Sequence, residues 1–171
     1  DWLREAAKVA ASGELPLWWT TPLGLPILQE YKTMKGKRVE AHWAGRRVDL
    51  MVQVEEQKLD QRAQANGVAP NFVHSLDACH LQMVALRAKE MGINHLAMIH
   101  DSFGTHAADT DKLARALRET FVELYTGDVL GNLYAELKDQ LGDELTEQLP
   151  PPPAMGDLDL SVIASSDYIF A

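Results

Sequence analysis

Hydrophobic residues recur at helical spacing in three stretches of this chain. Residues 2–11 place leucine and alanine three or four positions apart before a Ser-Gly pair, a pattern that predicts an amphipathic helix. Residues 111–125 and 128–141 repeat the pattern, and a glycine follows each of them closely. One helix is therefore expected at the start of the chain and two in its second half.

The strongest helix prediction covers residues 69–92. Pro70 suits a first turn, Asn71 is a capping residue type, and a glycine closes the segment. Its apolar side is predicted to comprise Val73, Leu76, Met83 and Leu86. Just upstream, residues 55–67 predict a separate polar helix that ends at Gly67.

Extended segments are predicted where helical spacing gives way to turn residues. Residues 17–31 are punctuated by proline and glycine, which favours two short strands about a turn. Residues 32–52 form two polar and basic arms about Ala44-Gly45, the pattern of a β-hairpin. Residues 93–109 predict two short strands joined at His100-Asp101-Ser102. The expected fold class is α+β, with small antiparallel hairpins packed on helices.

The last part of the chain changes character at Pro150. Residues 150–153 predict a stiff extended spacer. The residues beyond it are too apolar for a disordered end, and we expect them to pack back on the body. The side chains that require such a contact are Val162, Ile163, Tyr168, Ile169 and Phe170.

Composition limits the class of protein. Hydrophobic residues make up 46% of the 171 positions, enough to fold. Cys79 is the single cysteine, which excludes an internal disulfide framework and fits a reducing compartment. No apolar run approaches the roughly 20 residues that a membrane helix requires, so we expect a cytoplasmic chain with no membrane partner. The chain opens with Asp1 as though inside a helix, and we expect an excerpt of a longer polypeptide.

The net charge of −9 conceals a strong asymmetry. Residues 32–47 carry six lysines or arginines against one acid, whereas residues 109–147 carry ten acids against four bases. A basic ribbon can enter a DNA major groove, and arginine is the commonest reader of guanine edges there. The candidate DNA-binding residues are Lys37, Arg38, His42, Arg46 and Arg47. The alternative is that this strip is an ordinary solvated face.

Asp101 is the first candidate for chemistry. A carboxylate at the tip of a tight hairpin can reach a hard cation such as Mg²⁺, and two such ions can stabilise both oxygens of a phosphoryl or nucleotidyl transfer. The alternative is a polar turn, because Asp and Ser favour turns for local hydrogen bonding. A nucleophilic triad of Ser102 with its two neighbours is excluded, because adjacent strand residues point to opposite faces.

A second candidate is the row formed by His74, Asp77 and His80. Histidine and aspartate can both bind zinc, although helical residues that share one ion are usually four apart. The alternative for His80 is a hydrogen-bonded histidine that faces the core.

Four segments, in order along the chain, resemble the C-terminal portion of the single-subunit, bacteriophage-type DNA-directed RNA polymerases, which are related to the mitochondrial enzymes. The segments are TTPLGLPILQEY (20–31), APNFVHSLDACH (69–80), IHDSFGTHAAD (99–109) and SDYIFA (166–171). The resemblance implies a palm and fingers portion of a right-hand polymerase. It implies a promoter-reading hairpin at 32–52, a helix at 69–92 and a palm hairpin at 93–109. Further helices at 110–149 and a tail at 150–171 would follow.

The resemblance also implies roles for individual residues. His100-Asp101 matches the palm motif whose aspartate binds the catalytic magnesium ions, with His100 in support. His74 matches a histidine beside the incoming nucleotide and the nascent base pair. The same neighbourhood is implied for Asn71, Phe170 and Ala171. The side chains of the basic hairpin differ from the family pattern, so a promoter preference cannot be transferred.

The function implied is template-dependent RNA synthesis with two Mg²⁺ ions, in a phage or prophage enzyme working in the bacterial cytoplasm. Its partners would be promoter and template DNA, nascent RNA, nucleoside triphosphates and the remainder of the polymerase chain. The family's second metal-binding aspartate and its Lys/Tyr helix have no counterpart in residues 1–171. We therefore expect the isolated chain to bind metal poorly and to polymerise nothing.

Two alternatives stay open from the sequence. A related DNA polymerase also carries a His-Asp pair in its palm, but glutamate typically follows there and Ser102 follows here. A non-catalytic DNA-binding module would retain the basic hairpin alone.

Overall fold

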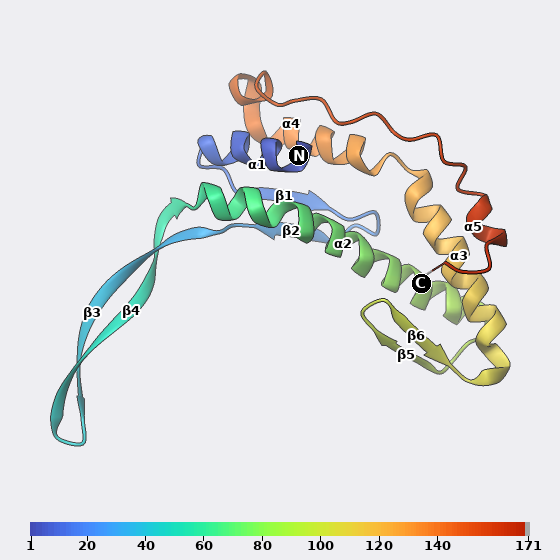
Figure 1. The fold of residues 1–171 in the computed structure, drawn as a ribbon, viewed down its shortest axis with the longest axis horizontal. Helices are drawn as coiled ribbons and strands as arrows, with labels where there is room; N and C mark the ends of the chain where they lie inside the picture. The colour runs from blue at the N-terminus through green and yellow to red at the C-terminus, as the bar shows by residue number, and fades with distance from the viewer. Residues whose placement is uncertain (170–171) are drawn as a thin grey trace.

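The backbone follows the expected alternation of helices and hairpins, and the computed structural model describes residues 1–169 (Figure 1). Phe170 and Ala171 lie outside the described residues. The helices are α1 (Trp2–Ser12), α2 (Gln61–Glu90), the short η1 (Ala107–Asp109), α3 (Thr110–Thr126), α4 (Val129–Thr146) and α5 (Val162–Ser165). The strands are β1 (Leu17–Thr20), β2 (Pro26–Gln29), β3 (Lys32–Trp43), β4 (Arg46–Leu59), β5 (Leu96–Ile99) and β6 (Ser102–Thr105).

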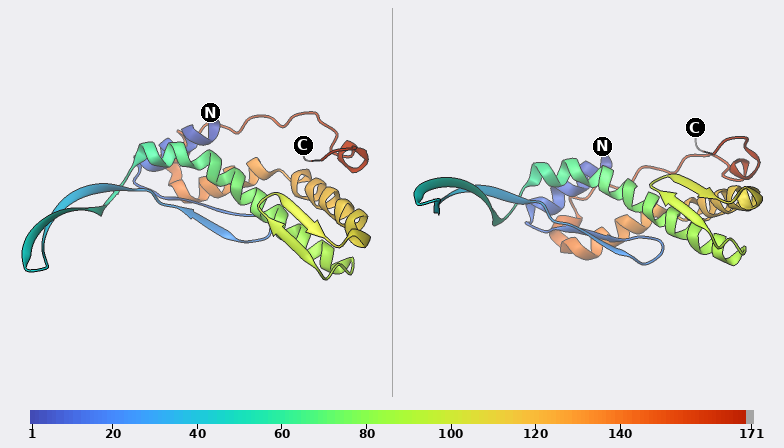
Figure 2. Two further views of the ribbon diagram at one scale, coloured as in Figure 1. Left: turned by 60° about the horizontal axis from the view of Figure 1, so that its bottom comes forward. Right: turned by 90° about the horizontal axis from the view of Figure 1, so that it is seen from below.

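The strands form three separate antiparallel hairpins around one long helix. Pairing joins β1 with β2, β3 with β4, and β5 with β6. The β3–β4 hairpin projects from the N-terminal end of α2, and β5–β6 lies beside its C-terminal half (Figures 1 and 2). The fold class predicted from the sequence, α+β with small antiparallel hairpins packed on helices, is confirmed.

Helix α2 is a single continuous helix, so the prediction of two helices, 55–67 and 69–92, is wrong. Residues 55–59 instead extend strand β4, which carries the basic hairpin to Leu59 rather than to residue 52. The helix begins after Asp60, whose side chain accepts a hydrogen bond from the Ala63 amide at 2.9 Å. An aspartate side chain that accepts a hydrogen bond from the backbone amide three residues later is a normal N-terminal cap.

Gly67 and Pro70 lie inside α2 rather than at its ends. A β-carbon at Gly67 would come within 2.6 Å of the Tyr31 ring, so this glycine allows a close approach and does not end a helix. Asn71 is no cap either, because its amide nitrogen donates to Gln29 Oε1 (2.8 Å) and to the Tyr31 hydroxyl (3.0 Å). The sequence predicted a helix boundary at Gly67 and Pro70. Gln29 and Tyr31, at and just after the end of β2, contact the helix at Gly67 and Asn71 instead, on both sides of Pro70.

The main core lies where α1, β1 and α4 meet the first half of α2 (Figure 1). Alanines let α1 approach α2 closely, and leucines of α4 close the other side. Trp19 is 2% exposed, packs edge-on against Phe72 with ring centroids 5.8 Å apart, and donates through its indole to Ser75 Oγ at 2.9 Å. The buried members are Ala6, Ala7, Ala10, Leu17, Trp19, Val68, Phe72, Leu76, Leu133, Leu137, Leu141 and Leu149.

A second core supports the β5–β6 hairpin at the other end of α2. Its buried members are Val84, Ala88, Ile93 and Leu113, against which Leu96, Phe103 and Leu117 pack. The predicted apolar side of α2 is correct for Leu76 and Met83 but wrong for Val73 and Leu86, which are 50% and 56% exposed. Different partners cover different sides of this long helix, so no single stripe is buried along its length.

The remaining segments depart from the predictions in detail. Helix α4 continues past Gly142 to Thr146, because the chain turns at this glycine (φ 69°) and then resumes the helix. The tail after Pro150 returns to α3, where the Arg118 guanidinium donates to the carbonyl of Ser166 at 3.1 Å. Its predicted burial is nevertheless wrong for Val162 and Tyr168, which are 50% and 82% exposed.

Candidate functional site

The β5–β6 hairpin presents His100 and Asp101 as its two-residue loop. The register pairs Leu96 with Thr105 and Ile99 with Ser102, which leaves those two residues at the tip. His100 adopts φ 55°, a left-handed conformation that is uncommon outside glycine and costs about 1–3 kcal/mol. Both side chains are exposed. The predicted pair of short strands is confirmed, but the loop is His100-Asp101 alone, because Ser102 already pairs with Ile99.

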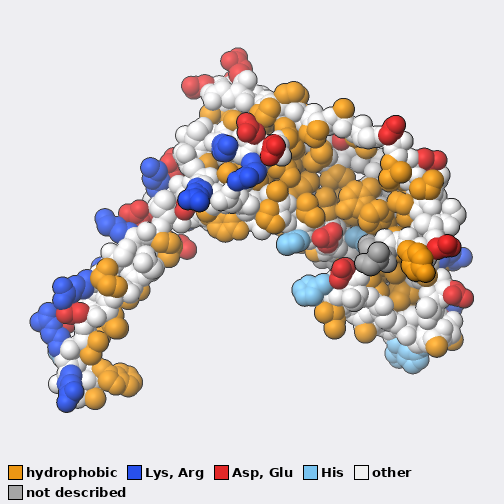
Figure 3. Space-filling model, viewed as in Figure 1, with side chains coloured by type: hydrophobic (Ala, Val, Ile, Leu, Met, Phe, Trp, Pro, Cys, Tyr) orange, Lys and Arg blue, Asp and Glu red, His pale blue; other side chains and the backbone are white. Residues whose placement is uncertain are grey.

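The tip of this hairpin faces α2 across a hollow of about 570 Å³. His74, Asp77, Ala78 and Leu81 line it from the helix, and His100 and Asp101 line it from the hairpin. Histidine and acidic side chains gather on this concave side of the molecule (Figure 3). The fold therefore brings together three of the predicted site residues, His74, His100 and Asp101, and adds the second carboxylate of Asp77.

The other predicted site residues are placed differently. Asn71 lies one turn before His74, but it is absent from the lining of the hollow, and its amide nitrogen contacts Gln29 and Tyr31. Its role beside a nucleotide stays a prediction. The same holds for Phe170 and Ala171, which lie outside the described residues.

The side chains that line the hollow are of the type that binds a hard cation, but too few of them lie close together to hold one. Carboxylate oxygens are preferred by Mg²⁺, and Asp77 and Asp101 both line the hollow. Neither forms an ion pair with another residue in the part of the chain that the structure describes. Within residues 1–169, however, no three His, Cys, Asp or Glu residues are grouped closely enough to hold a metal.

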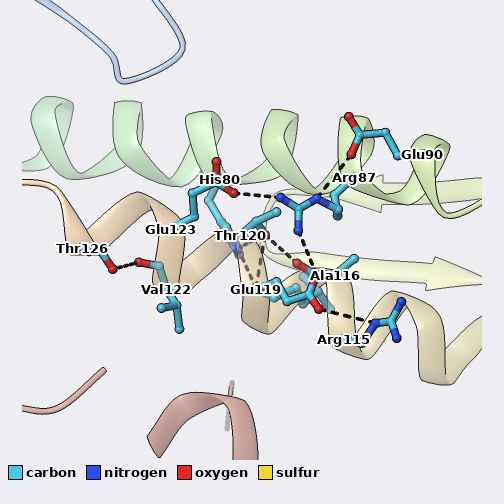
Figure 4. Close-up of polar contacts among 11 residues, drawn as sticks. His80, Arg87, Glu90, Arg115, Ala116, Glu119, Thr120, Val122, Glu123 and Thr126 are labelled. Atoms are coloured by element: carbon cyan, nitrogen blue, oxygen red, sulfur yellow. Dashed lines mark hydrogen bonds and ion pairs between the residues drawn. The ribbon is translucent and has the colours of Figure 1, made fainter. Parts of the chain in front are cut away.

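His80 belongs to the core and not to the hollow. It is 6% exposed, and its Nε2 lies 3.1 Å from both the Leu117 carbonyl and Thr120 Oγ1 (Figure 4). The alternative given for His80, a hydrogen-bonded histidine that faces the core, is confirmed. The zinc interpretation of the row is wrong, because His80 is turned into the protein while His74 and Asp77 line the hollow.

Burial sets the protonation of His80. Desolvation lowers the pKa of His80 below 6.5, opposed in part by the hydrogen bond to Leu117 and by the Asp77 carboxylate. The neutral imidazole is therefore the form that fits between α2 and α3. Arg87 ties the same helices together from the surface, at 2.8 Å from Glu119 and 3.0 Å from Glu123 (Figure 4).

The β3–β4 hairpin has two chemically different faces. Directly opposed residues of an antiparallel pair share a face, and faces alternate along each strand. The mainly polar face carries Met34, Gly36, Arg38, Glu40, His42, Arg47, Asp49, Met51, Gln53 and Glu55. The apolar face carries Lys35, Lys37, Val39, Ala41, Trp43, Arg46, Val48, Leu50, Val52 and Val54.

Charge is distributed unequally between the two faces. On the polar face Arg38 pairs with Asp49 at 2.5 Å, and Arg47 pairs with Glu40 at 3.0 Å. The cations of the apolar face, Lys35, Lys37 and Arg46, form no ion pair with any described residue. The five predicted DNA-binding residues therefore do not share one surface. Strict alternation along each arm could have revealed this division from the sequence.

Known proteins match the chain over nearly all of its length. The family model described as DNA-dependent RNA polymerase matches residues 1–148. This chain belongs to the DNA-dependent RNA polymerase family.

Its relatives include phage and plant organelle enzymes. It is 39% identical to the DNA-directed RNA polymerase of Enterobacteria phage T3 over 100% of the chain and 21% of that protein. It is 40% identical to mitochondrial DNA-directed RNA polymerase 1 of Nicotiana sylvestris, over 99% of the chain and 16% of that protein. It is 44% identical to chloroplastic/mitochondrial DNA-directed RNA polymerase 2 of Arabidopsis thaliana, again over 99% and 16%.

Membership of the RNA polymerase family bears on two of the sequence interpretations. The matched family and these relatives are RNA polymerases, which favours the RNA polymerase interpretation over the DNA polymerase alternative. Phage and organellar relatives are about equally similar, so a phage origin stays a prediction. Among the described residues, no helix is long and apolar enough to cross a membrane.

The buried neutral state of His80 makes stability depend on pH. The pKa of His80 is lower in the folded chain than in the unfolded chain, so the unfolded state binds more protons as the pH falls below 6.5. The free energy of unfolding should therefore fall between pH 6.5 and the lower folded-state pKa. His80→Asn should show a smaller fall, measured by urea unfolding at about pH 7.5 and about pH 5.5.

His42→Asn is the matched control, because His42 is exposed on the β3–β4 hairpin. It should keep the pH dependence of the unsubstituted chain. An equal loss of stability on acidification in the His80 variant and the unsubstituted chain would contradict this account.

Proposed function

We propose that the chain supplies one wall of the catalytic centre, and a DNA-contacting hairpin, to a template-directed RNA polymerase. The observation that carries this proposal is the shared hollow between the Asp101 tip and α2, in a chain that belongs to the RNA polymerase family. In this proposal α2 and the β5–β6 hairpin are parts of the fingers and palm of a right-hand polymerase. The chain spans 21% of the phage T3 relative, so the remaining polymerase would complete the centre.

The reaction is nucleotidyl transfer. The 3′-hydroxyl oxygen of the RNA attacks the α-phosphorus of a nucleoside triphosphate, a new O–P bond forms, and the bond to pyrophosphate breaks. The hydroxyl proton leaves to solvent or to a nearby base. Two bound Mg²⁺ ions would supply the charge that stabilises the attacking and leaving oxygens.

The residues of this chain contribute position and charge to that reaction. Asp101 offers carboxylate oxygens at an exposed tip, where a hard cation can be shared with substrate phosphates. His100 fixes the tip through its left-handed backbone, and His74 borders the same hollow from a rigid helix. The proposal assigns His74 to positioning the incoming nucleotide, with Asn71, Phe170 and Ala171 nearby.

The incomplete donor set agrees with this division of labour. Among the described residues, the hollow does not group three ligand side chains closely enough to hold one metal ion, and a two-metal centre requires further ligands. A second aspartate, and the Lys/Tyr helix expected to hold the triphosphate, would come from the rest of the polymerase. The 171-residue chain alone is then expected to bind Mg²⁺ weakly and to catalyse no polymerisation.

The β3–β4 hairpin provides the proposed contact with DNA. It is the most basic part of an otherwise acidic chain, and it projects away from the body into solvent (Figure 3). The free cations Lys35, Lys37 and Arg46 suit phosphates, which contribute affinity without reading sequence. Arg38 and Arg47 are held by carboxylates on the polar face, which suits them to the fixed geometry of base edges.

Catalysis is tested in a chimera in which this chain replaces the matched region of the phage T3 enzyme. Template-directed RNA synthesis is expected, and Asp101→Asn should lower kcat by at least about 10²–10³-fold, because charge stabilisation in the transition state is lost. Asp139→Asn, an exposed acid on α4, is the matched control and should leave kcat unchanged. A folded chimera that makes no RNA, or full activity in the Asp101 variant, contradicts the proposal.

DNA contact is tested with the 171-residue chain and duplex DNA over a range of salt concentrations. Lys37→Ala and Arg46→Ala should each weaken binding and lower the slope of log affinity against log salt by about one, because each removes a phosphate contact. Lys89→Ala, an exposed lysine at the far end of α2, should change neither. Equal effects of all three substitutions would point to diffuse attraction and not to a DNA-binding hairpin.

A further inference from the structure

We propose that His95 and His106 form a binding site for a divalent transition-metal ion, separate from the Asp101 hollow. The two residues flank the open end of the β5–β6 hairpin, whereas Asp101 lies at its closed end. The site does not depend on the polymerase proposal, because its ligands, its lining and its expected ion are all different.

The hairpin register brings the two imidazoles together. Leu96 and Thr105 are the last paired residues, so His95 and His106 lie one position further out on facing strands. Their ring centroids are 4.7 Å apart, with the ring planes inclined by 38°. The Thr105 hydroxyl donates to the His95 carbonyl at 2.7 Å and holds the two strand ends together.

The surroundings leave room for an ion with its remaining water ligands. His95 and His106 line an open hollow of about 480 Å³ at the open end of the hairpin. Ala97 and Gly104, paired across the strands, give this hollow a floor of small residues. Both histidines are exposed, and within residues 1–169 neither ring takes part in a hydrogen bond or an ion pair.

The spacing of the rings suits two ligands of one ion. A metal about 2.0–2.1 Å from an imidazole nitrogen lies about 3.2 Å from the centre of that ring. Two centroids 4.7 Å apart then subtend an angle of about 95° at the metal, between the square-planar and tetrahedral values. The centroid spacing is therefore compatible with two imidazoles that each direct one nitrogen at a shared ion.

The chemistry of the hollow selects the class of ligand. Imidazole favours Zn²⁺, Cu²⁺ and Ni²⁺ over Mg²⁺, which prefers oxygen. Asn94 also lines the hollow and adds an amide oxygen, but no carboxylate does. No lysine or arginine lines it, so it lacks the permanent positive charge of an anion site. A transition-metal ion is thus favoured over a phosphate.

A bound ion would join the two strands at their open end. The β5–β6 hairpin has only four residue pairs, and its tip carries the left-handed His100. A short hairpin gains order from any link between its strands. Metal at His95 and His106 would in this way stiffen the element that presents Asp101, without contacting Asp101.

The test is a Zn²⁺ titration of the 171-residue chain by calorimetry, with the histidine ring signals followed by NMR. One Zn²⁺ per chain is expected, with the largest shifts at His95 and His106. Because loss of even an outer-sphere partner costs about 10–100-fold in metal affinity, His95→Ala and His106→Ala should each weaken binding by at least about tenfold. His42→Ala, an exposed histidine on the other hairpin, should bind as the unsubstituted chain does.

Three results would overturn the proposal. They are unchanged affinity in both the His95 and the His106 variants, an equal loss in the His42 variant, and Zn²⁺-dependent shifts confined to His74 and His100. The last result would place the ion in the Asp101 hollow. Circular dichroism of each variant verifies that a loss of binding is not a loss of fold.

Discussion

The structure depends on hydrogen bonds that hold α2 in one piece across Gly67 and Pro70. Gln29 and Gln64 form a buried amide pair, with Gln29 Nε2 2.9 Å from Gln64 Oε1 and Gln64 Nε2 3.0 Å from the Gln29 carbonyl. Asn71, the residue directly after the proline, donates to Gln29 and to Tyr31. An interior proline and glycine cost a helix about 3 and about 1 kcal/mol, and four such bonds at about 1 kcal/mol each are of comparable size. The end of β2 therefore acts as a clamp on the helix.

A continuous α2 links the two surfaces to which function is assigned. The β3–β4 hairpin leaves its N-terminal end, and its middle turns bring His74 and Asp77 to the tip of β5–β6. Two separate helices could change their mutual angle, and the distance from the hairpin to the hollow would then vary. One rigid helix fixes that distance. The two cores lie at opposite ends of α2. The main core holds the β1–β2 hairpin against this helix, and the second core holds the β5–β6 hairpin against it.

The sequence predicted local structure well where the signal was local. The loop at His100-Asp101, the β3–β4 turn and the helices after residue 109 all follow from spacing and turn residues. The interior of α2 could not be predicted, because Gly67 is explained by the Tyr31 ring and Asn71 by Gln29, both distant in sequence. From the sequence, Asp77 was grouped with His74 and His80 as a possible metal site. Phe103 and Phe121 pack against His80 and show that it belongs to the core, whereas His74 and Asp77 line the hollow. These ring contacts could not be predicted from spacing along the helix. The prediction of a polymerase function came from the resemblance of four segments to a known family, because hydrophobic periodicity indicates helices and strands but no reaction.

Amide hydrogen exchange along α2 tests the central claim, that one clamped helix joins the DNA-contacting hairpin to the Asp101 hollow. The account predicts protection that continues through residues 65–75, on both sides of Pro70, at a level set by the main core. Gln29→Ala, which removes the side-chain contacts of Gln29 with Gln64 and Asn71, should increase exchange first at residues 66–72. Rapid exchange across residues 66–72 in the unsubstituted chain, with protection resuming only after Asn71, would show two helices and contradict the account.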